Sequence, residues 1–141
     1  MPDSSWSFLS RRHVSDFRIF RIHQDRYRID PEGVERDFVV IDSRDWVNVV
    51  PLTPSGEVVL VRQYRHGVRE LTLEIPGGMV DAGETAEQPA SRELREETGF
   101  APRRLRPVGV VSPNPAIQSN ACHTFVAEDV ERVGEPSPDP Y

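Results

Sequence analysis

Three glutamates near the middle of the chain are the residues whose spacing most strongly indicates chemistry. Glu93, Glu96 and Glu97 stand at positions i, i+3 and i+4, so in a helix all three carboxylates project from one face. Like charges at that spacing repel one another, and folding alone does not require them. A bound divalent cation would reverse the sign of this interaction, because hard cations prefer carboxylate oxygens. The spacing therefore predicts a metal site.

These glutamates belong to a longer run of constrained positions. A solvated helix face would explain any one of the charges, but not the whole set. The run matches the Nudix box, G-x5-E-x7-R-E-U-x-E-E-x-G-U with U an aliphatic or aromatic residue, at every fixed position. Those positions are Gly78, Glu84, Arg92, Glu93, Leu94, Glu96, Glu97, Gly99 and Phe100. The chain therefore resembles the Nudix hydrolases, a family that cleaves nucleoside diphosphates linked to another moiety.

The resemblance implies a ligand set for the cation. Glu93 and Glu97 would be the principal ligands, Glu96 a further or water-mediated ligand, and the backbone carbonyl of Gly77 an additional oxygen. Mg²⁺ is the implied cation and Mn²⁺ an acceptable substitute, because both bind all-oxygen sites. Together with Arg92, the three glutamates form the expected catalytic set.

The same resemblance gives Arg92 a supporting part. We expect it to pair with Glu84, which lies in the loop between Gly77 and the helix. Such a partner would hold the loop and helix in the geometry that the ligands need.

Outside the box, the chain resembles the subfamily of ADP-ribose pyrophosphatases and nucleoside diphosphate sugar hydrolases. The runs Arg62–Arg65 and Leu73–Gly78 carry this likeness. In that subfamily the second arginine of the first run contacts the diphosphate, which implies this role for Arg65. An arginine that opens the strand before the hairpin also serves the substrate, which implies Arg36. The subfamily has a marker proline fifteen residues beyond the box, where this chain has Pro115.

The implied reaction is Mg²⁺-dependent hydrolysis of the pyrophosphate bond of ADP-ribose or a related nucleoside diphosphate sugar, giving a nucleoside monophosphate and a sugar phosphate. Asn120 stands where the subfamily has an acidic residue, so another nucleotide sugar remains open. Two alternatives also remain. One is a Nudix hydrolase of nucleoside triphosphates or dinucleoside polyphosphates, and the other is a Nudix fold that senses nucleotides without turnover.

The end of the chain departs from the family pattern. The subfamily's glutamate base would fall by spacing just beyond Tyr141, and the nearest substitutes are Glu131, Glu135 and Asp139. Residues 133–141 are too rich in proline and glycine for a closing helix or a central strand. We therefore expect the C-terminal helix of the domain to be absent and the domain to be incomplete.

The elements that must position these residues form an α+β pattern of one helix among short strands. The resemblance implies the Nudix α/β/α sandwich with a mixed sheet. Residues 1–12 read as a frayed tail, and residues 46–52 and 57–63 as a hairpin whose second strand is mostly buried. The other expected strands are 17–22, 27–29, 36–41, 71–75, 105–111 and 121–126.

Two starting points for the helix remain open. Thr85 could be its N-cap, with Gln88 completing a capping box. Alternatively the helix begins one turn later, with Pro89 at its first position. Gly99 is expected to end it in a left-handed conformation.

We divide the chain into an N-terminal tail with dimerisation strands (1–45) and a Nudix domain (46–141). The N-terminal strands resemble the extra sheet through which the subfamily forms a domain-swapped dimer, which implies a homodimer.

Composition limits the setting and the partners. The net charge of −6 argues against nucleic-acid binding, which needs a basic surface, and all 17 basic residues are arginine. No apolar run reaches the length of a membrane span. The single Cys122 excludes an intrachain disulfide and fits a reducing compartment, with burial on a strand as its expected place. We therefore expect a cytoplasmic protein with a small nucleotide substrate.

Overall fold

The computed structural model describes residues 5–137, which divide into two compact units. The first unit holds the N-terminal residues up to Arg44, and the second begins at Asp45. The loop Ser112–Asn120 belongs to the first unit although it lies far along the chain. Hydrogen bonds from Ile41 to Ile117 and from Ser119 to Ile41 attach this loop to the end of the first unit's sheet.

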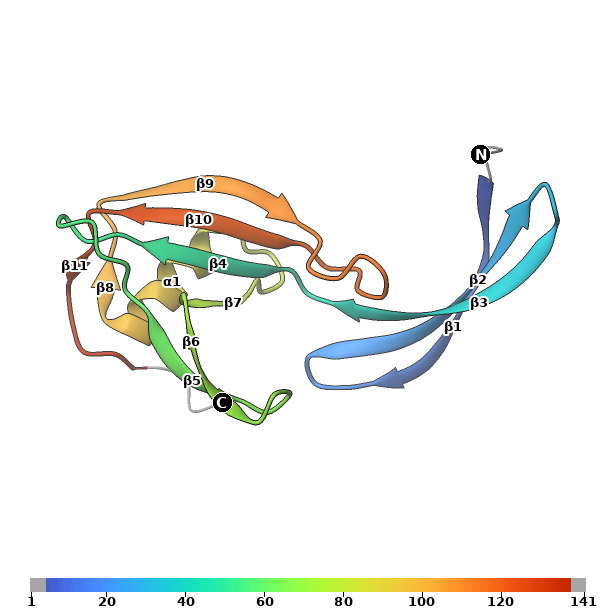
Figure 1. Ribbon diagram of the computed structural model, residues 1–141, viewed down its shortest axis with the longest axis horizontal. Helices are drawn as coiled ribbons and strands as arrows, with labels where there is room; N and C mark the ends of the chain where they lie inside the picture. Colours follow the sequence, from blue (N-terminus) through green and yellow to red (C-terminus); the bar gives the residue numbers. More distant parts are fainter. Residues whose placement is uncertain (1–4, 138–141) are drawn as a thin grey trace. The chain divides into compact units, whose positions relative to one another are not determined.

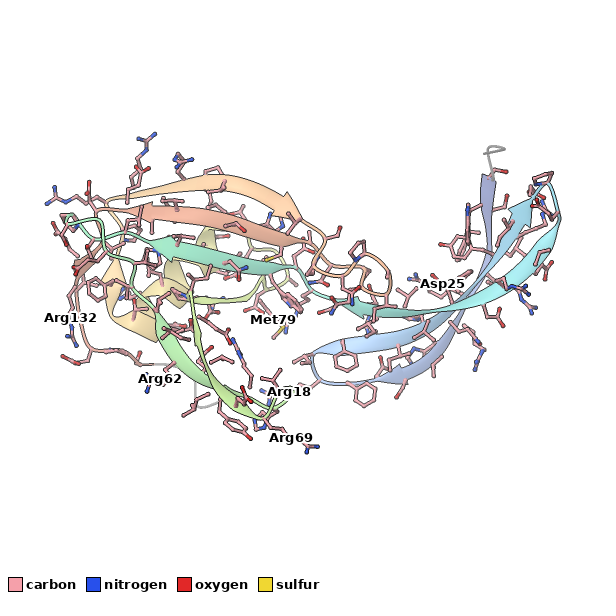
Figure 2. The ribbon with its side chains drawn as sticks, viewed as in Figure 1. Arg18, Asp25, Arg62, Arg69, Met79 and Arg132 are labelled. Carbon is pink, nitrogen blue, oxygen red and sulfur yellow. The ribbon has the colours of Figure 1, made fainter. Side chains whose placement is uncertain are left out.

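The first unit is an antiparallel sheet of three strands: β1 (Ser5–Asp16), β2 (Phe20–Asp30) and β3 (Val34–Ser43), in that order (Figure 1). One face of the sheet carries a cluster of aromatic rings, made by Trp6, Phe8, Tyr27 and Phe38. On the same face, a two-pronged hydrogen bond joins Arg11 to Asp25, with both N–O distances 2.7 Å. Asp25, labelled in Figure 2, is only 2% exposed.

Two predictions for this unit were wrong in part. Residues 5–12 are not a frayed tail but part of β1, because their backbone pairs with β2; residues 1–4 lie outside the described chain. Residues 20–22 and 27–29 are extended as predicted, but they belong to one continuous strand, β2, which follows a tight turn at residues 17–19. The strand predicted at 36–41 is confirmed within β3.

The second unit is built on a mixed sheet with the strand order β7-β4-β10-β9. Its strands are β4 (Trp46–Pro51), β7 (Gly77–Met79), β9 (Arg104–Val111) and β10 (Cys122–Glu128). β10 runs parallel to β4, whereas the other pairs are antiparallel. The mixed sheet and the strands expected at 105–111 and 121–126 are thereby confirmed, and Cys122 is buried as expected.

Helix α1 (Glu87–Thr98) packs on this sheet and closes the core (Figure 1). Ala90 and Leu94 are fully buried against alternate residues of β4 and β10, among them Val47, Val49 and Phe125. Within residues 5–137, α1 is the one helix, so these residues show one of the two helical layers that the predicted sandwich implies. It is not long and apolar enough to cross a membrane.

The start of α1 lies between the two predicted alternatives. The helix begins at Glu87, and its first backbone hydrogen bond runs from Ala90 to Ala86. Pro89 therefore occupies the first turn, where a helix leaves amide protons without partners and a proline is tolerated. The side chain of Gln88 accepts a hydrogen bond from the Thr85 backbone at 2.7 Å, which is half of a capping box. The end is as predicted: Gly99 is left-handed, with φ of 76°.

The predicted hairpin of residues 46–52 and 57–63 forms only at its turn end. The antiparallel bridge from Leu52 to Val58 and the backbone hydrogen bonds Thr53–Glu57 and Val59–Pro51 are present, but β10 and β7 pair with the rest of β4. A second hairpin forms between β5 (Val61–Arg65) and β6 (Glu70–Glu74), the latter within the strand predicted at 71–75. β5 is largely exposed rather than buried. The two-residue strands β8 (Phe100–Ala101) and β11 (Glu131–Arg132) pair with each other after the helix.

Candidate functional site

The site lies where α1 meets the short strand β7 at the edge of the sheet. Gly78 is where this approach is closest, because a Cβ there would overlap the carboxylate of Glu93. A Cβ on Gly77 would overlap the backbone carbonyl of Val47 on β4. Two consecutive glycines therefore let β7 pair closely with β4 at one residue and lie against the glutamate helix at the next.

Glu97 is held by two hydrogen bonds from different segments. Gln63 on β5 donates to its Oε1 at 2.7 Å, and the backbone amide of Gly77 donates to its Oε2 at 3.1 Å. Burial raises the pKa of Glu97 although both hydrogen bonds act to lower it. The charged form of the Glu97 carboxylate therefore remains destabilised, and a bound cation would stabilise it.

Glu93 shows the same electrostatic pattern. Its side chain is 17% exposed. Burial raises the pKa of Glu93, and the charges of Glu97 and Glu96 add to this effect. Arg92 opposes it only in part. Glu93 and Glu97 are thus two neighbouring carboxylates that are costly to ionise. A divalent cation bound between them would stabilise their charged forms.

Arg92 lies among the carboxylates rather than beside one of them. Its guanidinium is 2.9 Å from Glu93, 3.5 Å from Glu84, 3.6 Å from Glu96 and 4.0 Å from Asp81. Burial opposes the charged form of Arg92, but the negative charges of Glu93, Glu84 and Glu96 outweigh it and raise its pKa. The structure therefore shows the expected contact of Arg92 with Glu84, and adds a contact with Glu93.

The donor chemistry of the site fits a hard cation, but its side chains are not gathered around one point. Within residues 5–137, no three histidine, cysteine, aspartate or glutamate side chains are close enough together to hold a metal ion. Gln63 of β5 holds Glu97, whereas Glu96, 41% exposed, is 3.6 Å from Arg92 and lines a cavity beside α1 that Glu97 does not line. The residues that would hold Mg²⁺ or Mn²⁺ are Glu93 and Glu97, with Glu96 and the Gly77 carbonyl as further oxygen donors.

Arg65, the expected diphosphate contact, lies on the hairpin β5–β6. Its guanidinium forms two hydrogen bonds to Glu74, at 2.9 and 2.7 Å. Together with the Thr72 hydroxyl, Arg65 lowers the pKa of Glu74 to about 2. The charge of Glu97 also acts on Arg65 and contributes to its raised pKa. Arg65 is thus within electrostatic reach of the glutamates of the helix.

The two other expected substrate residues belong to the first unit. Arg36 is exposed on β3, opposite Tyr27 of β2, on the sheet face that carries the aromatic cluster. Pro115 is exposed in the loop Ser112–Asn120. Their part in substrate binding stays a prediction.

The substitutes considered for the base already have partners. Glu131 pairs with Arg103 at 2.6 Å, and Glu135 pairs with Arg132 at 2.7 Å. Asp139 lies outside the described residues.

Sequence reasoning missed two residues of the site, Gln63 and Glu74. Both lie inside the two runs that carry the subfamily likeness, Arg62–Arg65 and Leu73–Gly78. An uncharged glutamine between arginines carries no signal of its own. The alternation of side chains along a strand, which places Gln63 and Arg65 on the same face, was the clue available.

The chain was compared with known families and proteins. A model of the NUDIX domain matches residues 42–140. An ADP-ribose pyrophosphatase of Bacillus subtilis is 30% identical over 105 residues, a match that covers 74% of this chain and 57% of that protein. An ADP-ribose pyrophosphatase of Mycobacterium tuberculosis is 28% identical over 138 residues, covering 96% of this chain and 66% of that protein.

The fold has a close counterpart among solved structures. The crystal structure of an ADP compounds hydrolase superposes with a TM-score of 0.84 at 26% identity, covering 96% of this chain and 74% of that one. The chain spans 57% and 66% of the length of the two pyrophosphatases. The family model matches most of the chain, the fold matches a solved structure, and the glutamates of α1 lie against the glycines of β7. This chain belongs to the Nudix family.

Proposed function

We propose that this protein hydrolyses the pyrophosphate bond of ADP-ribose or a related nucleoside diphosphate sugar, with Mg²⁺ as its cation and Mn²⁺ as a substitute. The products would be a nucleoside monophosphate and a sugar phosphate. One observation supports the proposal most directly. Glu93 and Glu97, both with raised pKa, lie against the glycines of β7, and the neighbouring hairpin β5–β6 carries Arg65.

The arrangement suits an attack of water on phosphorus. Such a reaction needs charge stabilisation on the phosphoryl oxygens more than it needs covalent chemistry. A cation held by the glutamates would polarise those oxygens and lower the pKa of a bound water. Arg65 would bind the diphosphate and neutralise part of its charge, and Glu74 holds the guanidinium in one orientation through two hydrogen bonds.

The relatives support the substrate class. Two of them are named ADP-ribose pyrophosphatases, and the matched solved structure is named an ADP compounds hydrolase. Asn120 of this chain is 2% exposed, and neither polar atom of its side chain has a partner within the described residues. Because Asn120 stands where the ADP-ribose pyrophosphatase subfamily has an acidic residue, the proposal covers nucleoside diphosphate sugars as a class, with ADP-ribose as its first member.

A substrate panel tests the proposal. Purified protein with Mg²⁺ is incubated with ADP-ribose, other nucleoside diphosphate sugars, nucleoside triphosphates and a dinucleoside tetraphosphate, and the products are resolved by ion-exchange chromatography. We expect a nucleoside monophosphate from the diphosphate sugars, and no turnover with a chelator present. Preferred turnover of triphosphates or dinucleoside polyphosphates would replace the proposed substrate class. Binding without turnover of any of them would indicate a sensing module.

We also propose a cytoplasmic homodimer formed through the N-terminal strands. The support is the aromatic face of the first unit, where Trp6 and Phe8 are each 54% exposed in the single chain. Exposed aromatic patches of this kind are typical of protein interfaces. Light scattering at micromolar concentration should give twice the mass of the chain, and a monomer would contradict the proposal.

A further inference from the structure

Gln63 connects the hairpin β5–β6 to the glutamate helix. Its side-chain amide donates to Oε1 of Glu97 at 2.7 Å, and both groups are partly buried. Within residues 5–137, no other hydrogen bond or ion pair joins this hairpin to α1. The second oxygen of the same carboxylate accepts the Gly77 backbone amide at 3.1 Å. Glu97 is therefore fixed at both oxygens, once by the hairpin and once by β7.

The face of the hairpin that carries Gln63 also carries the expected substrate residue. Gln63 and Arg65 are two residues apart on β5, and their partners on β6 are Thr72 and Glu70. The hydroxyl of Thr72, which has a single proton, donates it to the carboxylate of Glu74, and its oxygen lies 3.2 Å from the Gln63 backbone carbonyl; Glu74 in turn holds Arg65. The hairpin therefore holds Gln63 against Glu97 and, on the same face, fixes Arg65 through Glu74 and Thr72.

We propose that Gln63 is a positioning residue that orients the Glu97 carboxylate for the cation and sets its place relative to Arg65. This inference rests on the proposed function insofar as Glu97 is taken as a metal ligand. An amide suits the role because it donates a hydrogen bond without adding a charge. An arginine or lysine in its place would neutralise Glu97 and compete with the cation. Each carboxylate oxygen has two acceptor sites, so one on each remains for a ligand bond.

The test measures metal affinity apart from turnover. Mn²⁺ binding is followed by electron paramagnetic resonance in the wild-type protein and in the variants Gln63→Met, Glu97→Gln and the double variant. Methionine matches the length of glutamine but donates nothing. Gln24→Met on the first unit's sheet, where Gln24 accepts a hydrogen bond from Arg12, serves as the matched control.

We expect Gln63→Met to weaken Mn²⁺ binding by about 10- to 100-fold, the loss typical when a group that orients a metal ligand is removed. The control should bind as the wild type does. In the Glu97→Gln background, Gln63→Met should cost no further affinity, because the carboxylate it orients is already gone. A merely structural glutamine would instead lower the melting temperature of the metal-free protein and leave the affinity of the folded protein unchanged.

The outcomes separate this inference from the proposed function. Wild-type binding of Mn²⁺ with equal binding by Gln63→Met overturns the role of Gln63 and leaves the hydrolase proposal intact. A loss of Mn²⁺ affinity in Gln63→Met supports the role whichever nucleotide the panel identifies. Absence of Mn²⁺ binding in the wild type would overturn both.

Discussion

The paired glycines of β7 offer a sharp prediction, because the same added methyl group meets different obstacles at neighbouring positions. In Gly78→Ala the new Cβ would overlap the carboxylate end of Glu93, a flexible side chain that can rotate away. In Gly77→Ala it would overlap the Val47 carbonyl and lie 3.0 Å from Oδ1 of Asn48, next to a backbone that cannot rotate away. Gly78→Ala should therefore damage the site with little effect on the fold, whereas Gly77→Ala should destabilise the fold and, because the Gly77 amide holds Glu97, disturb the site as well.

The magnitudes follow from these contacts. Overpacking against the backbone in Gly77→Ala should cost about 1–3 kcal/mol, which for a chain of this size lowers the melting temperature by about 3–10 °C. Gly78→Ala forfeits the 2.9 Å contact between Glu93 and Arg92. Because that arginine is 36% exposed, the loss should be at most about 1 kcal/mol. Mn²⁺ affinity should nevertheless fall at least about tenfold, because a ligand is displaced.

Thermal denaturation of the metal-free proteins and Mn²⁺ binding measure the two effects separately. Gly109→Ala on β9 is the control, since an added Cβ there meets nothing within 4 Å. It should change neither the melting temperature nor the affinity. The reasoning fails if Gly78→Ala lowers the melting temperature as much as Gly77→Ala does, or if it binds Mn²⁺ as the wild type does.

Three further predictions concern single charged groups. Glu97→Gln should abolish metal-dependent turnover while circular dichroism shows the fold retained; unchanged turnover would exclude Glu97 as a ligand. Arg65→Ala should raise the pKa of Glu74 from about 2 towards its ordinary value in an NMR titration, and a pKa that stays near 2 would show that the pair is not formed in solution. Arg11 lowers the pKa of Asp25, so their pair stabilises the folded state above the ordinary aspartate pKa and this contribution is lost as the pH falls through the lowered value. Asp25→Asn should flatten this acid dependence in pH-dependent unfolding, and an unchanged profile would contradict the assignment.

Much of the candidate site could be predicted because its signals are local. The spacing of Glu93, Glu96 and Glu97 places them on one side of a helix whatever the rest of the fold does. The end of the helix at Gly99 is likewise a property of one residue's backbone freedom. The contact of Arg92 with Glu84 could be expected from the family pattern, since the loop between them is short.

The errors arose where strand pairing decides the structure. Trp46–Pro51 pairs in parallel with β10, more than seventy residues further along the chain, so the predicted local hairpin is confined to its turn end. The alternation of apolar residues indicated a strand but carried no information about its partner. In the same way, the position of residues 5–12 near the chain start suggested a tail, and their alternation of Ser5, Trp6, Ser7 and Phe8 did not show that β2 would be their partner.

The sequence by itself therefore determined the family, the helix and the glutamates that it presents, because helical geometry relates residues only a few positions apart. Only the tertiary structure decided how those glutamates are held. Gln63 reaches Glu97 across 34 residues of chain, and Gly78 makes room for Glu93 through the pairing of β7 with β4. Such contacts depend on the register of strands and on close packing between distant segments, which no local spacing of residues encodes.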